Sequence, residues 1–284
     1  MIYKMKFRKS ISLLTLLLIA TIGFAGSPVK VMTWNIRYDN PDDGVNRWDN
    51  RKEEVAGLIQ NYKADIICLQ EVLHNQYLYL QYLLNYGTYG VGRDDGKEAG
   101  EYAPVFYNKA RFLALNQGHF WLAEDPSRPS KGWDAACIRI ATWMELKDKL
   151  SGDTVLVINT HFDHMGDTAR LESARLIADF CYQKAGNNPL IVCGDFNCTL
   201  DSPALKTLRS NASLLTGQAT ANRENLPGFT YCGFDGKGKD GDIIDFIFYR
   251  SFATAGNYAI ITDRKGPNFP SDHLPVYLEL FYSH

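Results

Sequence analysis

The sequence predicts an α+β fold in which helices cover the outside of two packed sheets. Strand-like segments far outnumber helix-like ones, and their order along the chain does not alternate as a doubly wound sheet requires. The 284 residues are 45% hydrophobic and 22% charged, which is typical of a globular protein. We find no internal repeat and no Pro/Ser-rich linker, so we expect one large domain after the amino-terminal segment.

Short apolar runs bounded by polar residues or glycine predict the strands. Five runs are apolar throughout, as in strands buried on both faces: Val29–Asn35, Asp65–Gln70, Val155–Thr160, Leu190–Gly194 and Ile243–Tyr249. Three others have the character of half-buried strands: Ala103–Tyr107, Ile138–Leu146 and Leu274–Phe281.

Three segments have helical patterns. Asn50–Tyr62 has Glu53 three residues after Asn50, close to a capping box. His74–Leu84 follows the second strand. Thr168–Lys184 follows Asp167, a good N-cap residue, and carries apolar residues on one face. Few helices among many strands favour a layered sandwich.

The first 25 residues have the layout of a secretory signal peptide. Four basic residues precede an apolar run from Ile11 to Phe24, which is too short to span a bilayer comfortably, and Ala25 is a small residue at the cleavage position. An uncleaved anchor helix is the alternative. We expect a signal peptide at 1–25, a domain at 26–284, export to the periplasm or beyond, and no stable membrane insertion after cleavage.

Net charge argues weakly against a protein dedicated to duplex DNA. Loss of residues 1–25 removes four basic residues and no acidic one, so the net charge of −2 becomes −6. Non-specific DNA binding depends mainly on positive charge, and no strongly basic stripe is evident. A local basic groove would still serve a nuclease.

Six cysteines raise the question of disulfides in an exported protein. Cys68, Cys181 and Cys193 lie on apolar strand or helix faces, so we expect buried free thiols there. Three more lie in loop-like stretches, where the sequence is compatible with one bridge: Cys137, Cys198 and Cys232.

Polar groups interrupt the pattern at the ends of the buried strands. An ionisable group there costs free energy unless it is paired, hydrogen-bonded or bound to a metal. Singly, each residue has an ordinary explanation, such as a helix start, an Asx turn or a buried histidine. As a set they would be costly to satisfy without a shared purpose. The set is Asn35, Glu71, His161, Asp195, Asn197, Asp245, Asp272 and His273.

Oxygen ligands of this kind select Mg²⁺, Mn²⁺ or Ca²⁺ over zinc. Phosphoester hydrolysis needs charge stabilisation at the phosphoryl oxygens, an aligned water and help for the leaving oxygen. Two histidines and an additional aspartate suit the last two needs. The residues therefore predict Mg²⁺-dependent phosphoester hydrolysis, with Mn²⁺ as a substitute.

The motifs around these residues resemble those of the endonuclease/exonuclease/phosphatase superfamily. They occur in the family's order between residues 34 and 273: Trp34-Asn35, Leu69-Gln70-Glu71, Asn159-Thr160-His161, Gly194-Asp195-Phe196-Asn197, Ile244-Asp245-Phe246 and Ser271-Asp272-His273. The resemblance implies a four-layer αββα sandwich of two mostly antiparallel sheets. The segments Trp48–Arg51 and Gly132–Asp134 are similar to an exported bacterial branch.

The resemblance also implies a metal site and a water-activating group. Glu71 would be the main metal ligand, with Asn35 and Asp272 nearby. Asp195 would orient or deprotonate the attacking water, and Asn197 would contact the phosphate.

Two histidines complete the implied catalytic set. His273 would hydrogen-bond the scissile phosphate, with Asp245 fixing its tautomer and orientation. His161 would contact the phosphate or protonate the leaving group. The resemblance leaves open which group is the general base.

Two substrate-binding positions are inferred from the same resemblance. Arg139 falls where the family often has a phosphate-contacting arginine, and a surface salt bridge is the alternative. The segment Glu101–Tyr107 resembles one that carries a site tyrosine, matched by Tyr102 or Tyr107, and an ordinary strand residue is the alternative. We take Tyr107 as the candidate.

The substrate class stays open between nucleic acid, a sugar phosphate and a phosphorylated glycan, and no protein partner is implied. Two loop-rich aromatic stretches, Asp39–Arg51 and Gly118–Trp143, are candidates for specificity loops. A non-catalytic phosphate- or glycan-binding module with the same fold is the alternative function.

Overall fold

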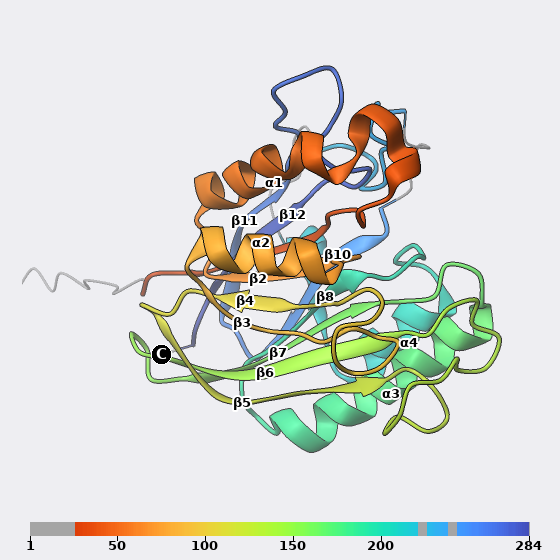
Figure 1. Cartoon of the computed structure of the whole chain (residues 1–284). Helices are drawn as coiled ribbons and strands as arrows, with labels where there is room; N and C mark the ends of the chain where they lie inside the picture. Colours follow the sequence, from red (N-terminus) through yellow and green to blue (C-terminus); the bar gives the residue numbers. More distant parts are fainter. Residues whose placement is uncertain (1–25, 221–225, 238–242, 284) are drawn as a thin grey trace, which may run out of the picture.

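The computed structural model describes residues 26–220, 226–237 and 243–283, with two six-stranded sheets packed face to face. The predicted signal peptide at 1–25 lies outside the described residues. Helices α1 and α2 cover the outer face of the first sheet, and α3 and α4 cover that of the second (Figure 1). These four layers confirm the predicted α+β sandwich.

The first sheet has the strand order β11-β12-β1-β2-β4-β3. Its strands are β1 (Val29–Asn35), β2 (Ile66–Gln70), β3 (Gly87–Tyr89), β4 (Val105–Tyr107), β11 (Thr254–Ile260) and β12 (Val276–Phe281). Strands β1 and β2 are parallel, and the 3₁₀ helix η1 (Pro41–Asn46) and α1 (Trp48–Tyr62) connect them; α2 (His74–Leu84) follows β2. Strand β12 runs antiparallel to β1, with Val29 opposite Leu280, so the two ends of the domain lie side by side (Figure 1).

The second sheet has the strand order β5-β6-β7-β8-β10-β9. Its strands are β5 (Phe112–Trp121), β6 (Ile140–Asp148), β7 (Thr154–His161), β8 (Leu190–Asp195), β9 (Leu215–Thr216) and β10 (Asp245–Arg250). Strands β7 and β8 are parallel and joined by α3 (Asp167–Ala185). Helices α4 (Pro203–Asn211) and α5 (Gly217–Thr220) follow β8.

Side-chain alternation explains why the central strands are apolar on both faces. In β1, Val29 and Val31 point into the core between the sheets, whereas Met32 and Trp34 pack in the core beneath α1 and α2. Strands β7 and β8 divide their side chains in the same way between the inter-sheet core and the core beneath α3 and α4. Each central strand therefore serves two cores.

Two predicted helix starts were wrong. Helix α1 begins at Trp48, and Asn50 lies within it and donates to the carbonyl of Val45. Helix α3 begins at Asp167, so that residue is not the cap. A residue distant in sequence, Asp134, accepts hydrogen bonds from the first-turn N–H groups of α3. Local sequence cannot reveal such a cap because it comes from another loop.

Among the described residues, seven elements were not predicted: η1, β3, β5, β9, β11, α4 and α5. Strands β5 and β11 lie at sheet edges and carry exposed polar residues, so they lack the apolar signal of the central strands. All six cysteines lie in the described part of the chain and are free thiols, so the bridge considered for the loop cysteines does not form. No helix among the described residues is long and apolar enough to cross a membrane.

Candidate active site

The predicted site residues lie at one end of the space between the sheets, where the inward strand faces end. The inward positions of β1, β7 and β8 are apolar in the first part of each strand, and the strands end in Asn35, His161 and Asp195. Pairing places His161 beside Asp195, and Asp245 opposite Asp195. Because β1–β2 and β7–β8 are parallel pairs, polar strand ends from distant parts of the chain converge here.

A buried amide pair lies between the apolar core and the site. Gln70 Nε2 donates to Asn159 Oδ1 at 2.7 Å and to Thr33 Oγ1 at 3.0 Å. Asn159 Nδ2 donates to the carbonyls of Leu69 and Pro104, both at 2.8 Å. These bonds connect the two sheets directly, so they fix the separation of the site residues that follow on each sheet.

His273 lies between two carboxylates. Its Nδ1 is 2.9 Å from Asp245 Oδ2, and its Nε2 is 3.7 Å from Asp195 Oδ2. Burial alone would lower the pKa of His273, but Asp245 and Asp195 outweigh it and raise the pKa well above its ordinary value. Burial and the charge of Asp245 raise the pKa of Asp195 to about 7. This is the geometry that the predicted orienting role of Asp245 requires.

The predicted metal ligands lie beside this group. Asn35 Nδ2 donates to Glu71 Oε1 and to Asp195 Oδ2, both at 3.0 Å. The guanidinium of Arg37 lies 3.9 Å from Glu71 Oε2 and 3.9 Å from Asp272 Oδ2. Burial raises the pKa of Asp272, and Glu71 adds to this effect. A divalent cation held by the oxygens of Glu71 and Asp272 would offset the repulsion, so these carboxylates fit an Mg²⁺-type ion. Asn35 Oδ1 accepts the backbone N–H of Arg37 at 3.0 Å.

Three residues of this region have left-handed backbone conformations that favour glycine. The φ angles are 58° at Arg37, 58° at Glu71 and 49° at Asn197. Such conformations cost about 1–3 kcal/mol each and concentrate at functional sites. Here each one turns the chain at the end of a strand and directs a polar side chain to the site.

His161 lies at the centre of the pocket. Its Nε2 is 3.0 Å from Asn197 Nδ2 and 3.5 Å from Asp195 Oδ2, while its Nδ1 is 3.7 Å from Glu101 Oε2. Burial lowers the pKa of His161 well below its ordinary value, and the charge of Arg139 adds to this. The imidazole is therefore neutral at physiological pH.

Beyond His161, Arg139 is anchored by the turn after β7. It is 4% exposed, with Nε 3.4 Å from Asp163 Oδ2 and Nη2 3.1 Å from His164 Nδ1. Its Nη1 has no hydrogen-bond partner among the described residues. Asp163 also accepts four backbone N–H groups, from Ala136, Cys137, Met165 and Gly166. Asp163 thus fixes two loops, and His164 lines the pocket.

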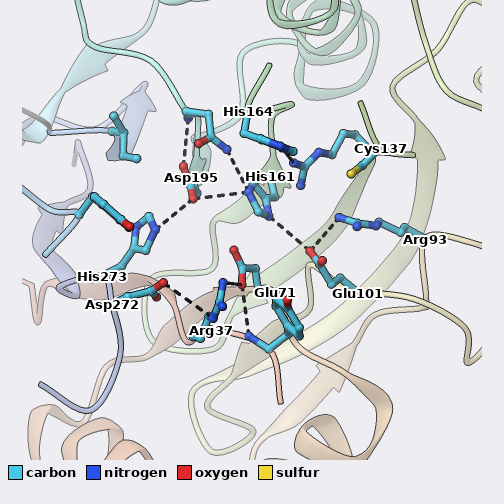
Figure 2. A pocket seen from close by; sticks show the side chains of 15 residues that line it. Arg37, Glu71, Arg93, Glu101, Cys137, His161, His164, Asp195, Asp272 and His273 are labelled. Carbon is cyan, nitrogen blue, oxygen red and sulfur yellow. Dashed lines mark hydrogen bonds and ion pairs between the residues drawn. The ribbon is translucent and has the colours of Figure 1, made fainter. Parts of the chain in front are cut away.

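These side chains line a pocket of about 530 Å³, which suits a small molecule (Figure 2). We call one part the reaction end: Glu71, Asp195, Asn197, Asp272 and His273, together with Asn35, which is hydrogen-bonded to Glu71 and Asp195. We call the opposite part the far end: Arg93, Glu101, Cys137, Arg139 and His164. His161 lies between them (Figure 2). Arg37, Tyr38, Tyr231 and Ile244 complete the lining.

Among the described residues, two groups of three His, Cys, Asp or Glu side chains have their ligand atoms within 4.8 Å of one another. The first is Asp195, Asp245 and His273, whose short contacts are those of the orienting arrangement above. The second is Cys137, Asp163 and His164. The N–H donors already occupy the oxygens of Asp163, so we do not assign a metal to the second group.

The structure brings together all but one of the predicted site residues. Asn35 and Asp245 support the reaction end through hydrogen bonds, and Arg139 and the others line the pocket. Tyr107 does not reach it, because its ring packs over Gly87 in the neighbouring strand. The hydroxyl of Tyr102, the other tyrosine considered, is hydrogen-bonded to His74 Nδ1 at 2.8 Å.

Four residues of the pocket were not predicted from the sequence as site residues: Arg37, Arg93, Glu101 and Tyr231. Arg37 follows Asn35 by two residues, which was a usable signal. Arg93 and Glu101 lie on the loop between β3 and β4 and carry no local signal.

The family model "Endonuclease/Exonuclease/phosphatase family" matches residues 32–273. The protein therefore belongs to this family of phosphoester hydrolases, as its motifs predict. The structure is similar to an endonuclease/exonuclease/phosphatase from Bacteroides vulgatus, with 42% identity and a TM-score of 0.86 over 91% of this chain and 100% of that one.

Two other similar proteins carry names, and the name of the first states an activity. A mannosyl-6-phosphatase from Bacteroides thetaiotaomicron is 34% identical, with a TM-score of 0.84 over 89% of this chain and 99% of that one. Human nocturnin is 25% identical over 90% of this chain, and the match spans only 66% of nocturnin's length.

Proposed function

We propose that this protein is a divalent-metal-dependent phosphatase that acts on a small phosphorylated molecule, with a sugar phosphate the first candidate. The observation that carries the proposal is the pocket of about 530 Å³, in which the reaction end and the far end lie on either side of His161. A pocket of this size suits a small ligand. The similarity to a mannosyl-6-phosphatase supports a sugar phosphate.

Mg²⁺, or Mn²⁺ in its place, would be held by Glu71, Asn35 and Asp272 and would stabilise negative charge on the phosphoryl oxygens. Asp195, with a pKa of about 7, would orient the attacking water and accept its proton. His273, charged and oriented by Asp245, would donate to a phosphoryl oxygen. These roles combine the predicted assignments with the observed geometry.

His161 would assist departure of the leaving oxygen. It is neutral and lies on the far-end side of Asp195, where the organic part of a substrate would begin. A neutral imidazole can hydrogen-bond the leaving oxygen without competing with the metal for the phosphate.

Nucleic acid is the weaker candidate. Duplex DNA binding usually depends on excess positive charge, whereas the chain has a net charge of −2. The arginines of the far end, Arg93 and Arg139, are paired with Glu101 and Asp163. These two arginines of the pocket therefore offer a nucleic-acid strand little unpaired positive charge.

Export is a second part of the proposal and rests on the signal-peptide pattern of residues 1–25. Cell fractionation of the native host, with amino-terminal sequencing of the mature protein, tests it. Recovery of the full-length chain in the cytoplasm would contradict it.

The main test is phosphate release by the purified protein from mannose 6-phosphate, glucose 6-phosphate and p-nitrophenyl phosphate, beside plasmid DNA and RNA. We expect EDTA-sensitive release from the small monoesters, and loss of about 10²–10⁴-fold in Asp195→Asn if that group is the general base. Rapid EDTA-sensitive cleavage of DNA or RNA with no monoester turnover would replace the proposal with a nuclease.

A further inference from the structure

The far end of the pocket is built differently from the reaction end. Its residues come from the loop between β3 and β4, the segment before β6 and the turn after β7. One imidazole ring, that of His161, separates the carboxylate of Glu101 from that of Asp195. One substrate molecule could therefore place its phosphate at the reaction end and the rest of its structure at the far end.

Glu101 presents a carboxylate to the pocket. Its Oε2 accepts a hydrogen bond from Arg93 Nη1 at 2.7 Å, and its side chain is 18% exposed. Arg93 is held in turn because its carbonyl accepts the indole N–H of Trp121 at 2.7 Å. The pair is therefore a fixed carboxylate–guanidinium plane at the pocket wall.

Arg139 offers an unused donor beside this pair. Its Nε and Nη2 contact Asp163 and His164, and its buried Nη1 has no partner among the described residues. An unpaired buried donor costs free energy, and a ligand oxygen at this position would recover it.

The charges of the far end indicate what it binds. Arg93 faces Glu101, and Arg139 faces Asp163, so each positive group already has a negative partner. A second phosphate would be repelled by Glu101 and would gain little from paired arginines. The described residues of the far end include no Phe, Tyr or Trp, so a base would find no large aromatic ring to stack on there. Fixed donors next to a fixed acceptor suit a neutral molecule rich in hydroxyl groups.

We propose that Glu101, Arg93 and Arg139 form a hydroxyl-binding subsite that holds the sugar ring of a phosphorylated sugar while its phosphate lies at the reaction end. The inference rests on the proposed phosphatase function and assigns its specificity. Glu101 accepts hydrogen bonds from ring hydroxyls, and the two guanidinium groups donate to hydroxyl oxygens. His161 then lies at the junction of ring and phosphate.

The test compares two substrates that differ in hydroxyl groups, mannose 6-phosphate and p-nitrophenyl phosphate, in the wild type and in Glu101→Gln. We take the ratio of kcat/KM for mannose 6-phosphate to kcat/KM for p-nitrophenyl phosphate. Loss of the charged acceptor should lower this ratio by about 10- to 100-fold. Most of the loss should appear as a higher KM. Glu98→Gln, an exposed carboxylate on the same loop with a side chain 76% exposed, is the matched control and should leave the ratio unchanged.

An equal fall in kcat for both substrates, with KM and the ratio unchanged, would overturn the subsite, since Glu101 would then act only by positioning His161. Wild-type turnover of p-nitrophenyl phosphate with no preference for either hexose phosphate would overturn the subsite but leave the phosphatase function. Turnover of neither would overturn both. If Glu101→Gln fails to fold, Arg139→Lys gives the same ratio test, because lysine loses the fixed planar fork of donors.

Discussion

The two ends of the pocket differ in the elements that carry them. The reaction end consists of residues at the ends of paired strands, whose positions are fixed by sheet register and by the amide pair beneath them. The far end consists of residues on loops, held by carboxylates such as Asp163 and Glu101. Strand ends are suited to chemistry that needs fixed distances, whereas loops can vary between relatives and alter substrate choice.

The largest effect should come from the metal site of the reaction end. Glu71→Gln removes the charged ligand, and we expect activity on every phosphoester to fall about a thousandfold or more, as with EDTA. Thermal unfolding is a second readout: Mg²⁺ should raise the Tm of the wild type but not that of the variant. The control is Glu53→Gln on the exposed face of α1. If Mg²⁺ raised the Tm of Glu71→Gln as much as that of the wild type, Glu71 would not be a metal ligand.

A smaller loss is expected at the next layer of the reaction end. Asp245 is a positioning residue, since its Oδ2 accepts a hydrogen bond from Nδ1 of His273 at 2.9 Å. Asp245→Asn should lower kcat by about 10- to 100-fold with little change in KM, equally for all substrates. Steady-state kinetics check this, with the exposed Asp179→Asn as control. A change in the ratio between substrates would show that the two ends are not separable.

The smallest effect on chemistry should come from the anchor of the far end. Asp163→Asn weakens four backbone hydrogen bonds and the contact with Arg139, and we expect a loss of about 1–3 kcal/mol in the free energy of unfolding. Mannose 6-phosphate turnover should fall more than that of p-nitrophenyl phosphate, because Arg139 loses its support.

The stability effect of Asp163 should depend on pH. Burial opposes ionisation, but the N–H donors outweigh it and hold the pKa of Asp163 well below its ordinary value. A lowered folded-state pKa stabilises the protein above the unfolded-state value of about 3.9, and this stabilisation is lost as pH falls further. Urea unfolding of the wild type and Asp163→Asn should differ most above about pH 4 and converge below it. The exposed Asp201→Asn should show no such convergence.

The same contrast explains what the sequence could predict. The reaction end could be predicted from the sequence because polar residues stand out in strands that are mostly apolar. These residues are Asn35, Asp195 and Asp245. The central strands were predicted for the same reason, since each is buried on both faces. Edge strands β5 and β11 lack that contrast and were missed.

Only part of the far end could be predicted from the sequence. Arg139 was predicted through resemblance, whereas Arg93 and Glu101 were not singled out. Their loop adopts its position through contacts with Trp121 and with each other, and such long-range contacts leave no periodic pattern. The stretches Asp39–Arg51 and Gly118–Trp143 were expected to carry specificity. Of the second, Cys137 and Arg139 line the pocket, while its two ends belong to β5 and β6.

The antiparallel pairing of β1 with β12 has a practical consequence for handling the protein. Val29 lies opposite Leu280, whereas Asn35, at the other end of β1, belongs to the reaction end. The seven residues of β1 separate the two by about 20 Å. An affinity tag, a fusion partner or a surface tether joined just before residue 26 or just after residue 283 would therefore lie on the side opposite the pocket, and protein immobilised there should present its pocket to solution.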